Sequence, residues 1–376
     1  MRVAIVAESF LPAVNGVTHS VMRILEHLRE EGHEAIVIAP AGAETSPKSY
    51  AGFPVVALPA VSLPGYADIR VATTPQYRLE RMLEDFAPDV VHLAAPIYLG
   101  YRAALAATWL DIPIVAIYQT DVPSYAAAYG LPQAEALLWW RVRELHSMAT
   151  MTLAPSSSAR SQLLSQGVPR VGLWGRGVDS VRFDPAKRDE QFRRTVAPDG
   201  QHIIGYVGRL ANEKRVADLA VLQDLPNTKL VIVGDGPLRA ELERSLPTAH
   251  FTGQLTGEDL PRVLASFDVF VHPGELETFG QSIQEALASG VPAIAPAKGG
   301  PIDIINSSRT GWLYAPGDLV AMHGHVRDLL GDERKRQAFS RAARHQVAHR
   351  TWKFMCTELL GCYQEAIIAR KYSQVA

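Results

Sequence analysis

Two glutamates around a predicted helix start give the strongest chemical signal in the sequence. Glu277 and Glu285 stand in the segment Pro273–Gly290, which reads PGELETFGQSIQEALASG. We predict a strand ending at His272, a glycine-containing loop and a helix from about Gln281. The unpaired N–H groups and positive dipole end of a first helical turn suit a phosphate, and two carboxylates can accept hydrogen bonds from two sets of hydroxyls. The alternative is a helix cap with a solvated glutamate.

A pair of basic residues follows another predicted strand. Arg209 and Lys214 stand in Gly208–Lys214 (GRLANEK), directly after the strand expected at 203–207. Arginine offers a planar fork for phosphate oxygens and lysine a point charge on a flexible stem, so the pair is typical of a diphosphate clamp. A surface salt-bridge pair is the alternative. A further strand leads into the tight turn Gly234–Pro237, where the backbone can approach a ligand.

The elements that must position these residues follow a regular alternation. Short apolar, β-branched runs alternate with amphipathic segments, as parallel strands do with their helical crossovers. The fold class is therefore predicted to be α/β, with two doubly wound parallel sheets that bind ligands beyond the carboxyl ends of their strands. The predicted strands are 3–7, 34–39, 55–58, 90–93 and 114–117, then 203–207, 229–233, 269–272 and 292–295; the predicted helices include 18–31, 260–265, 282–289 and 352–371.

A stretch rich in glycine and proline near Gly167–Pro185 breaks both periodicities and marks a domain boundary. We place an interdomain linker at 171–186, after an N-terminal Rossmann-like domain at 1–170 and before a C-terminal one at 187–351. The helix at 352–371 follows the second sheet and is expected to pack back on the N-terminal domain.

Composition and charge exclude several classes of protein. A net charge of −2 over 376 residues gives no general attraction to nucleic acid. The only cysteines, Cys356 and Cys362, have neither a disulfide-framework nor a zinc spacing and fit a reducing cytoplasm. No apolar run reaches the ~20 residues of a membrane-spanning helix. The sequence has no Asp-x-Asp pair and no Glu/His cluster, so we predict no metal and no other cofactor.

Other classes of protein also have Rossmann-like halves. An NAD-dependent oxidoreductase needs Gly-x-Gly-x-x-Gly after its first strand and an acidic residue after its second. Here the first strand leads to Glu8-Ser9-Phe10 and the second ends at Ala39-Pro40, so both marks are missing. An epimerase, a phosphorylase and a non-catalytic lipid- or nucleotide-binding protein remain as alternatives.

The clusters at Gly208–Lys214, Gly234–Pro237 and Pro273–Gly290, in this order, resemble the retaining glycosyltransferases of family 4, also called glycosyl transferases group 1. This family includes sucrose synthase, bacterial phosphatidylinositol mannosyltransferases and the plant sulfolipid synthase. The resemblance covers essentially the whole chain, and its most specific element is the Glu-x7-Glu pattern of Glu277 and Glu285. It implies the GT-B fold, in which two Rossmann-like domains face each other across a cleft, with the acceptor on the N-terminal side and the nucleotide sugar on the C-terminal side.

The resemblance also implies roles for individual residues. Arg209 and Lys214 would hold the donor diphosphate, Glu277 the hydroxyls of the transferred sugar and Glu285 the ribose of the nucleotide. The predicted donor-binding residues are Gly16, Val17, Arg209, Lys214, Gly253, Leu255, Glu277, Thr278, Phe279, Gly280 and Glu285, and the predicted catalytic residues are Glu277, Arg209, Lys214, Gln119 and Asp121.

Two positions of the N-terminal half depart from the family pattern. Relatives carry a glycine-rich loop after the first strand, where this chain has only Gly16, beside Asn15 and Val17. The N–H groups of Gly16 and Val17 would reach the diphosphate, whereas a structural turn is the alternative for Asn15. Relatives place a histidine where Gln119 stands. Glutamine cannot take a proton, which favours a route in which the leaving phosphate takes the proton of the acceptor.

Three residues are candidates for the acceptor side. Asp121 follows the predicted strand 114–117, and capping of the next turn is its alternative. His92 lies at a predicted strand end, where a hydrogen-bonded structural histidine is the alternative. Arg176 stands in Trp174–Asp179 (WGRGVD), where most relatives have asparagine, and it would contact the acceptor or an anionic sugar.

The WGRGVD segment resembles a branch of the family with plant sulfoquinovosyltransferase and actinobacterial mannosyltransferases. The resemblance favours GDP-mannose as donor and a diacylglycerol glycolipid or phosphatidylinositol mannoside as acceptor; a UDP-sugar donor is the alternative. Tyr77–Leu83 and Leu137–Arg143 mix apolar anchors with arginine and are candidates for weak, peripheral attachment to the cytoplasmic face of the membrane. Ordinary core-facing helices are their alternative. The excess of arginine over lysine fits an actinobacterial source.

Overall fold

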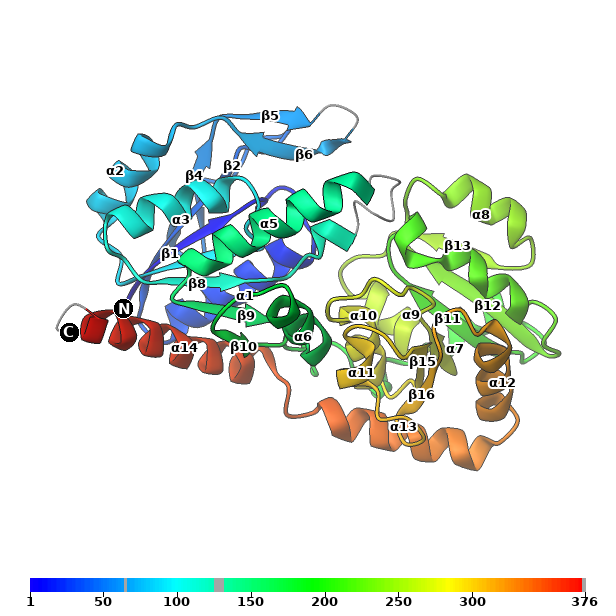
Figure 1. Cartoon of the computed structure of the whole chain (residues 1–376). Coiled ribbons are helices and arrows are strands. Elements are labelled where there is room, and N and C mark those ends of the chain that lie inside the picture. Colours follow the sequence, from blue (N-terminus) through cyan, green and yellow to red (C-terminus); the bar gives the residue numbers. More distant parts are fainter. Residues whose placement is uncertain (64–65, 125–131, 374–376) are drawn as a thin grey trace. The chain divides into compact units, whose positions relative to one another are not determined.

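The computed structural model describes residues 1–63, 66–124 and 132–373. The chain divides into two compact units. The first contains Met1–Pro123, Pro132–Arg176 and the helix that starts at Trp352, and the second contains Gly177–Thr351. Figure 1 labels the elements of both units.

The first unit is built on an eight-stranded sheet with the order β10-β9-β8-β7-β1-β2-β4-β3, in which only β3 pairs antiparallel. A separate hairpin, β5–β6, accompanies it. Apolar side chains of the helices cover both faces of the sheet. The strands are β1 (Arg2–Ala7), β2 (Glu34–Pro40), β3 (Ser49–Tyr50), β4 (Phe53–Leu58), β5 (Ala60–Leu63), β6 (Tyr66–Ala72), β7 (Val90–Ala94), β8 (Ile114–Ile117), β9 (Met151–Ala154) and β10 (Val171–Leu173). The helices are α1 (Gly16–Glu30), α2 (Gln76–Phe86), α3 (Leu99–Trp109), α5 (Pro132–Met148), α6 (Ser157–Ser165) and α14 (Trp352–Ser373).

The helix α14 belongs to the first unit although it is the last element of the chain. Its buried residues Met355, Leu359 and Tyr363 share a core with β1 and α1. The indole of Trp174 donates to the carbonyl of Met355 at 2.7 Å, and Tyr363 Oη lies 2.7 Å from Nδ1 of His92 on β7. These contacts hold α14, drawn in red in Figure 1, against the sheet of the first unit.

The second unit contains a six-stranded parallel sheet with the order β13-β12-β11-β14-β15-β16. Two apolar clusters form the core on its two faces. The strands are β11 (His202–Val207), β12 (Thr228–Val233), β13 (His250–Gly253), β14 (Val269–Val271), β15 (Ala293–Pro296) and β16 (Gly311–Tyr314). The helices are α7 (Glu190–Val196), α8 (Arg239–Ser245), α9 (Asp259–Ala265), α10 (Gln281–Ala288), α11 (Pro301–Ile304), α12 (Leu319–Leu330) and α13 (Glu333–Val347), with 3₁₀ turns η1 (Pro185–Lys187), η2 (Asn212–Lys214) and η3 (Val216–Leu222).

The predicted fold class of two Rossmann-like, doubly wound sheets is confirmed. All nine predicted strands are present within one or two residues. The strands that were not expected are β3, β5, β6, β9, β10, β13 and β16. The first three residues of the predicted linker, Val171–Leu173, form the edge strand β10, which pairs with β9. The first unit therefore extends to Arg176. A short, half-buried edge strand such as β13 lacks the long apolar run that signals a central parallel strand.

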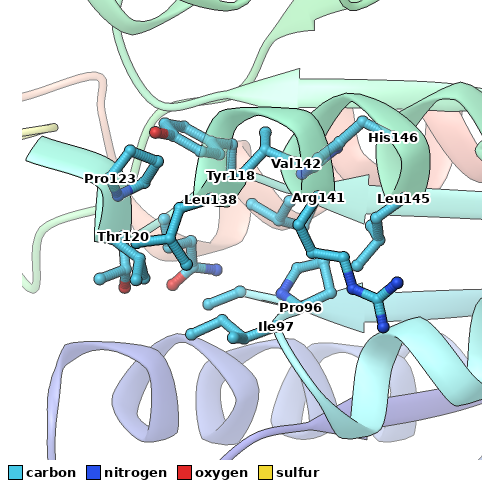
Figure 2. A pocket seen from close by; sticks show the side chains of 14 residues that line it. Pro96, Ile97, Tyr118, Thr120, Pro123, Leu138, Arg141, Val142, Leu145 and His146 are labelled. Carbon is cyan, nitrogen blue, oxygen red and sulfur yellow. The ribbon is translucent and has the colours of Figure 1, made fainter. Parts of the chain in front are cut away.

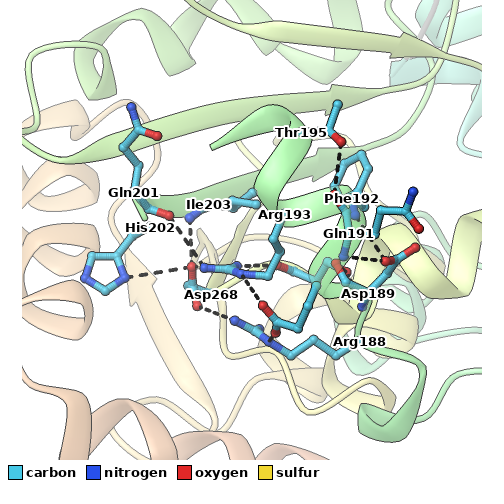
Figure 3. Close-up of polar contacts among 12 residues, drawn as sticks. Arg188, Asp189, Gln191, Phe192, Arg193, Thr195, Gln201, His202, Ile203 and Asp268 are labelled. Carbon is cyan, nitrogen blue, oxygen red and sulfur yellow. Dashed lines mark hydrogen bonds and ion pairs between the residues drawn. The ribbon is translucent and has the colours of Figure 1, made fainter. Parts of the chain in front are cut away.

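A buried carboxylate secures the start of the second sheet (Figure 3). Asp268 accepts from the N–H of Ile203 at 2.8 Å, from Arg193 at 3.0 Å and from Arg188 at 3.4 Å. Because these three donors come from β11, α7 and the segment before α7, the carboxylate ties the entry segment to the sheet. The network lies at the amino end of β11, away from the edge where ligands bind in such folds, and we assign it a structural role.

Burial lowers the pKa of several histidines, which makes stability depend on pH. Burial lowers the pKa of His92 to about 3 and that of His146 to about 4, while the unfolded chain titrates near the ordinary value of 6.5. As pH falls below 6.5 the unfolded chain takes up these protons and the folded protein does not, so stability is lost.

We therefore predict that the free energy of unfolding, measured by urea denaturation, falls between pH 7 and pH 5. Each such histidine contributes a slope of up to about 1.4 kcal/mol per pH unit. The variant His146→Gln should lose less stability over the same range than the unsubstituted protein. Equal slopes for the two proteins would contradict the assignment of a buried neutral imidazole.

Candidate functional site

The order of strands in the second sheet decides which loops meet. From β11 the chain moves outward to β12 and β13, and it then returns to β14 on the other side of β11. The loops after β11 and β14 therefore leave neighbouring strands in opposite directions, which is the position where α/β sheets bind ligands. Gly208–Lys214 follows β11 and His272–Gly280 follows β14. Topology thus brings together two of the segments singled out by the sequence.

The centre of this edge is an ion pair between Lys214 and Glu277. The lysine Nζ donates to Oε1 of Glu277, although the residues are 63 positions apart in the chain. The side chains are only 18% and 14% exposed. Burial by itself raises the pKa of Glu277, but Lys214 and His272 outweigh burial and hold that pKa well below its usual range. Glu277 is therefore an ionised, oriented acceptor.

A buried histidine supports the same carboxylate and was not predicted as a site residue. His272 Nε2 lies 3.3 Å from Oε1 of Glu277, and its ring stacks on Tyr206 with 6.0 Å between the centroids. Tyr206 Oη in turn donates to the carbonyl of Arg209 at 3.0 Å. In the sequence, His272 stands out only as a polar residue at the end of an apolar strand. This pattern is a weak indication of a functional histidine, because many structural histidines show it as well.

Two glycines give the loop with Glu277 its shape. The N–H of Gly300 donates to the carbonyl of Glu277 at 2.7 Å. A Cβ atom would lie 2.2 Å from the Glu277 carbonyl oxygen if built on Gly299, and 1.9 Å from that of Phe279 if built on Gly300. Both distances are too short for any side chain, so this close approach requires glycine. The sequence suggested neither residue as part of the site.

Arg209 differs from the other basic residues at this edge. Its side chain is exposed, and in the part of the chain that the structure describes no acidic side chain pairs with it. By contrast, Arg215 pairs with Asp218 at 2.7 Å and with Glu275 at 2.9 Å. Arg209 thus offers a guanidinium to a ligand, whereas Arg215 is used within the protein.

The remaining predicted donor-binding residues of this unit line the same edge. Gly280 adopts a left-handed backbone, with φ of 102°, and begins α10, where Gln281 donates to Glu285 at 3.2 Å. Phe279 is buried in the core and Thr278 is half-buried. Gly253 ends β13, and its carbonyl accepts from the N–H of Gly234 at 2.9 Å; Leu255 is half-buried two residues later.

In the first unit the strand order reverses between β1 and β7, which is the switch point of that sheet. The chain moves from β1 to β2 and β4, and then returns to β7, β8, β9 and β10 on the other side. At this edge Glu8, directly after β1, accepts from the N–H groups of Ile97, Tyr98, Leu99 and Gly100 at 2.6–3.2 Å. The carboxylate thereby caps the N-terminus of α3 and complements its dipole. The sequence gave no indication of this role.

Three predicted residues of the first unit lie together at the same edge. Gln119 Oε1 accepts from Nη2 of Arg176 at 2.9 Å. Nη1 of Arg176 is 2.7 Å from the point where a Cβ on Gly16 would lie. Asn15 caps α1 by accepting from the N–H groups of Val17 and Thr18, so the structural alternative for Asn15 holds and the Val17 N–H is already donated.

The other two acceptor-side candidates are held within the first unit. Asp121 is mostly buried; it accepts from Tyr118 Oη at 2.9 Å and from Gln162 at 3.0 Å. His92 is completely buried beneath α14, where Tyr363 contacts it. A side chain sealed in the core cannot reach an acceptor, so the acceptor-side prediction for His92 is corrected to a structural role.

A mostly apolar pocket opens beside Gln119 in the first unit (Figure 2). Side chains of α5 form one wall, and the segments after β7 and β8 form the other. Its lining residues are Ala95, Pro96, Ile97, Ile117, Tyr118, Gln119, Thr120, Val122, Pro123, Leu138, Arg141, Val142, Leu145 and His146. Such a lining suits an apolar group whose polar end lies toward Gln119 and Thr120.

The described residues contain neither a metal-ligand cluster nor a membrane-spanning helix. Within residues 1–63, 66–124 and 132–373, no three His, Cys, Asp or Glu side chains gather as a metal site would require. Over the same ranges, no helix combines the length and the apolar character that crossing a bilayer demands.

Comparisons with known proteins agree with this geometry. The family model described as Glycosyltransferase Family 4 matches residues 14–182, and the one described as Glycosyl transferases group 1 matches residues 187–346. The GDP-mannose-dependent alpha-mannosyltransferase of Mycolicibacterium smegmatis is 49% identical over 380 residues, with 100% of both chains covered. The sulfoquinovosyl transferase SQD2 of Arabidopsis thaliana is 32% identical, over 95% of this chain and 72% of its own.

A solved structure supports the fold independently. The Anabaena protein HepE, crystallised in complex with UDP, matches with a TM-score of 0.78 at 16% identity, over 97% of this chain and 100% of that one. Two Rossmann-like domains in one chain, together with this structural match, show the GT-B fold. The chain belongs to glycosyltransferase family 4, the glycosyl transferases group 1, as the sequence predicted.

The glycine contacts at Glu277 lead to a prediction about stability. Gly300→Ala should destabilise the protein by about 1–3 kcal/mol, because the new Cβ forces the backbone at Phe279 to move. Urea denaturation measures the change. Gly324→Ala is the matched control, since Gly324 lies inside α12 with nothing within 4 Å of an added Cβ. Equal stability of the two variants would contradict the close approach described here.

Proposed function

We propose that this protein transfers mannose from GDP-mannose to a lipid-linked acceptor with retention of configuration. The observation that carries the proposal is the convergence of Arg209, Lys214 and Glu277 at one edge of the second sheet. Relatives that are 45–49% identical to this chain are named GDP-mannose-dependent alpha-mannosyltransferase, and the relative named sulfoquinovosyl transferase is 32% identical. The identities therefore favour GDP-mannose over a UDP-sugar as the donor.

The basic residues suit the charge that develops on a leaving diphosphate. Arg209 presents a guanidinium without an acidic partner among the described residues, and the ammonium of Lys214, which donates to Glu277, adds a second positive charge at the same edge. Preorganised donors of this kind stabilise the transition state because they need no rearrangement as the bond breaks. The N–H groups at the start of α10 add the positive end of a helix dipole. We assign the charge stabilisation of the reaction to these groups of the chain.

The carboxylates suit the hydroxyls of the donor. Glu277 stays ionised across the physiological range because Lys214 and His272 hold its pKa low. It therefore accepts hydrogen bonds from sugar hydroxyls at any working pH, which orients the sugar for transfer. Glu285 on α10 is assigned to the ribose, with Gln281 orienting its carboxylate. Gly253, Leu255, Thr278, Phe279 and Gly280 complete the donor site.

A lipid acceptor and peripheral membrane attachment are supported by apolar groups of the first unit. On α5, Leu137 and Trp140 are 64% and 50% exposed, and Arg143 lies one turn further along. Exposed apolar anchors with a neighbouring arginine are typical of interfacial helices. The apolar pocket beside Gln119 adjoins the same helix and suits the lipid end of an acceptor. The second candidate segment, Tyr77–Leu83, instead buries Leu79 and Leu83 in the core and exposes Tyr77.

The transfer itself is tested with radiolabelled GDP-mannose and a lipid extract, with label in the organic phase as readout. Glu277→Gln should lower kcat about 100-fold, because it removes an acceptor aimed at the sugar. The same variant should change the Kd for GDP, which lacks the sugar, by no more than about threefold. Lys187→Gln is the control, since Lys187 forms an exposed pair with Glu258. Product at the unsubstituted rate from a Glu277→Ala, Lys214→Ala double variant would refute the assignment.

The donor base is tested separately by thermal denaturation with a panel of nucleotide sugars. A ligand that binds only the folded protein raises the melting temperature by mass action. GDP-mannose should give the largest rise when GDP-, UDP- and ADP-sugars are compared at equal concentration. A larger rise with UDP-glucose would contradict GDP-mannose as the donor and favour a UDP-sugar. The assignment of the donor-binding residues would be unaffected.

A further inference from the structure

A buried imidazole with unpaired nitrogens lies next to the carboxylate of Glu277. His272 is 2% exposed, and neither of its ring nitrogens has a hydrogen-bond partner in the described parts of the chain. Its Nε2 lies 3.3 Å from Oε1 of Glu277, just beyond the usual range of a hydrogen bond. Burying polar atoms without partners is unfavourable, so a phenyl ring would fill this space at lower cost. The position of Nε2 thus points to Glu277 as the reason for a histidine here.

The central strands of the second sheet hold this imidazole in place. His272 directly follows β14, and its backbone N–H donates to the carbonyl of Ile294 on β15 at 2.9 Å. Its ring stacks on that of Tyr206, with 6.0 Å between the centroids and 15° between the planes. Tyr206 is completely buried on β11, the strand on the other side of β14. A side chain supported by three adjacent strands is a rigid point against which a group in a loop can be oriented.

Both contacts to the carboxylate of Glu277 are made to the same oxygen. Lys214 Nζ donates to Oε1, and His272 Nε2 approaches Oε1 as well. Among residues 177–351, no hydrogen bond or ion pair to Oε2 accompanies them. Gly274 lies against both donors, since a Cβ there would be 3.1 Å from His272 Nε2 and 3.2 Å from Lys214 Cα. One oxygen of Glu277 is thus directed at the protein, and the other is available to a ligand.

We propose that His272 is a positioning residue, which donates from Nε2 to Oε1 of Glu277 and so directs Oε2 toward the hydroxyls of the transferred sugar. This inference rests on the proposed function, in which Glu277 accepts from those hydroxyls. Lys214 alone gives the carboxylate one point of contact at the end of a flexible stem, which leaves its rotation open. A second donor to the same oxygen, held by the sheet, restricts that rotation and keeps the sugar oriented for transfer.

Two substitutions of His272 separate the loss of the donor from the loss of the stacked ring. His272→Phe keeps an aromatic ring against Tyr206 and removes the nitrogen, whereas His272→Gln removes the ring and keeps an N–H donor. Transfer from radiolabelled GDP-mannose is measured for both. His272→Phe should lower kcat about tenfold, as expected for one lost hydrogen bond, and His272→Gln should stay within about threefold of the unsubstituted protein. Neither should change the Kd of GDP, measured by calorimetry, by more than about twofold, because GDP lacks the sugar.

A double-variant cycle shows whether His272 acts through Glu277. In the Glu277→Gln background, His272→Phe should change kcat by no more than about twofold, because the carboxylate that it positions is already gone. His27→Phe is the matched control, since His27 on α1 is 4% exposed and its Nδ1 also lacks a described partner. This control should leave kcat unchanged, and urea denaturation shows that each variant is folded.

Three outcomes would overturn the inference. A loss of kcat in His272→Gln equal to or greater than that in His272→Phe would show that the site does not depend on the nitrogen. An undiminished loss from His272→Phe in the Glu277→Gln background would show that His272 does not act through the carboxylate. Much weaker GDP binding in His272→Phe would indicate a general disturbance of the site. If the unsubstituted protein transferred no sugar, the proposed function would fail and the inference with it, whereas these three outcomes in an active protein overturn only the inference.

Discussion

A buried carboxylate that must remain charged is the constraint on which the second unit depends. Removing Glu277 from water is unfavourable unless a cation and further donors surround it. Lys214 and His272 meet that need from two different loops. Gly299 and Gly300, which follow β15, pack directly against the carbonyl groups of residues 277 and 279 and so shape the loop that carries Glu277. One electrostatic requirement thus fixes the conformation of three segments.

The sheet brings the two residues of the ion pair together from distant parts of the chain. Lys214 and Glu277 are 63 residues apart in the chain, yet β11 and β14 are adjacent strands. The order of strands reverses between them, so the following loops diverge and leave polar groups accessible. The first unit repeats the scheme between β1 and β7, where Glu8, Gln119 and Arg176 gather. The two sheets share a topology but place different chemistry at the same point.

Whether a feature of the fold or the site could be predicted from the sequence depends on how far apart in the chain the interacting residues lie. Central strands such as β1 and β11 have long apolar runs, and Glu277 belongs to a spaced motif within one segment, so local patterns identified them. Glu8 acts on N–H groups about 90 positions away, and His272 acts through a contact that no spacing encodes. Gly299 and Gly300 matter because of carbonyl groups elsewhere in the chain. Such roles exist only in the folded protein.

The same reasoning explains why a family histidine can be replaced by Gln119 without loss of the proposed chemistry. At this edge of the first unit Gln119 cannot titrate, and His92 is sealed in the core. Glu277 in the second unit is held ionised and therefore has little tendency to take a proton. In the proposed reaction the developing phosphate oxygens therefore take the proton of the acceptor. The protein then has to stabilise negative charge, for which Arg209 and Lys214 beyond β11 supply cations.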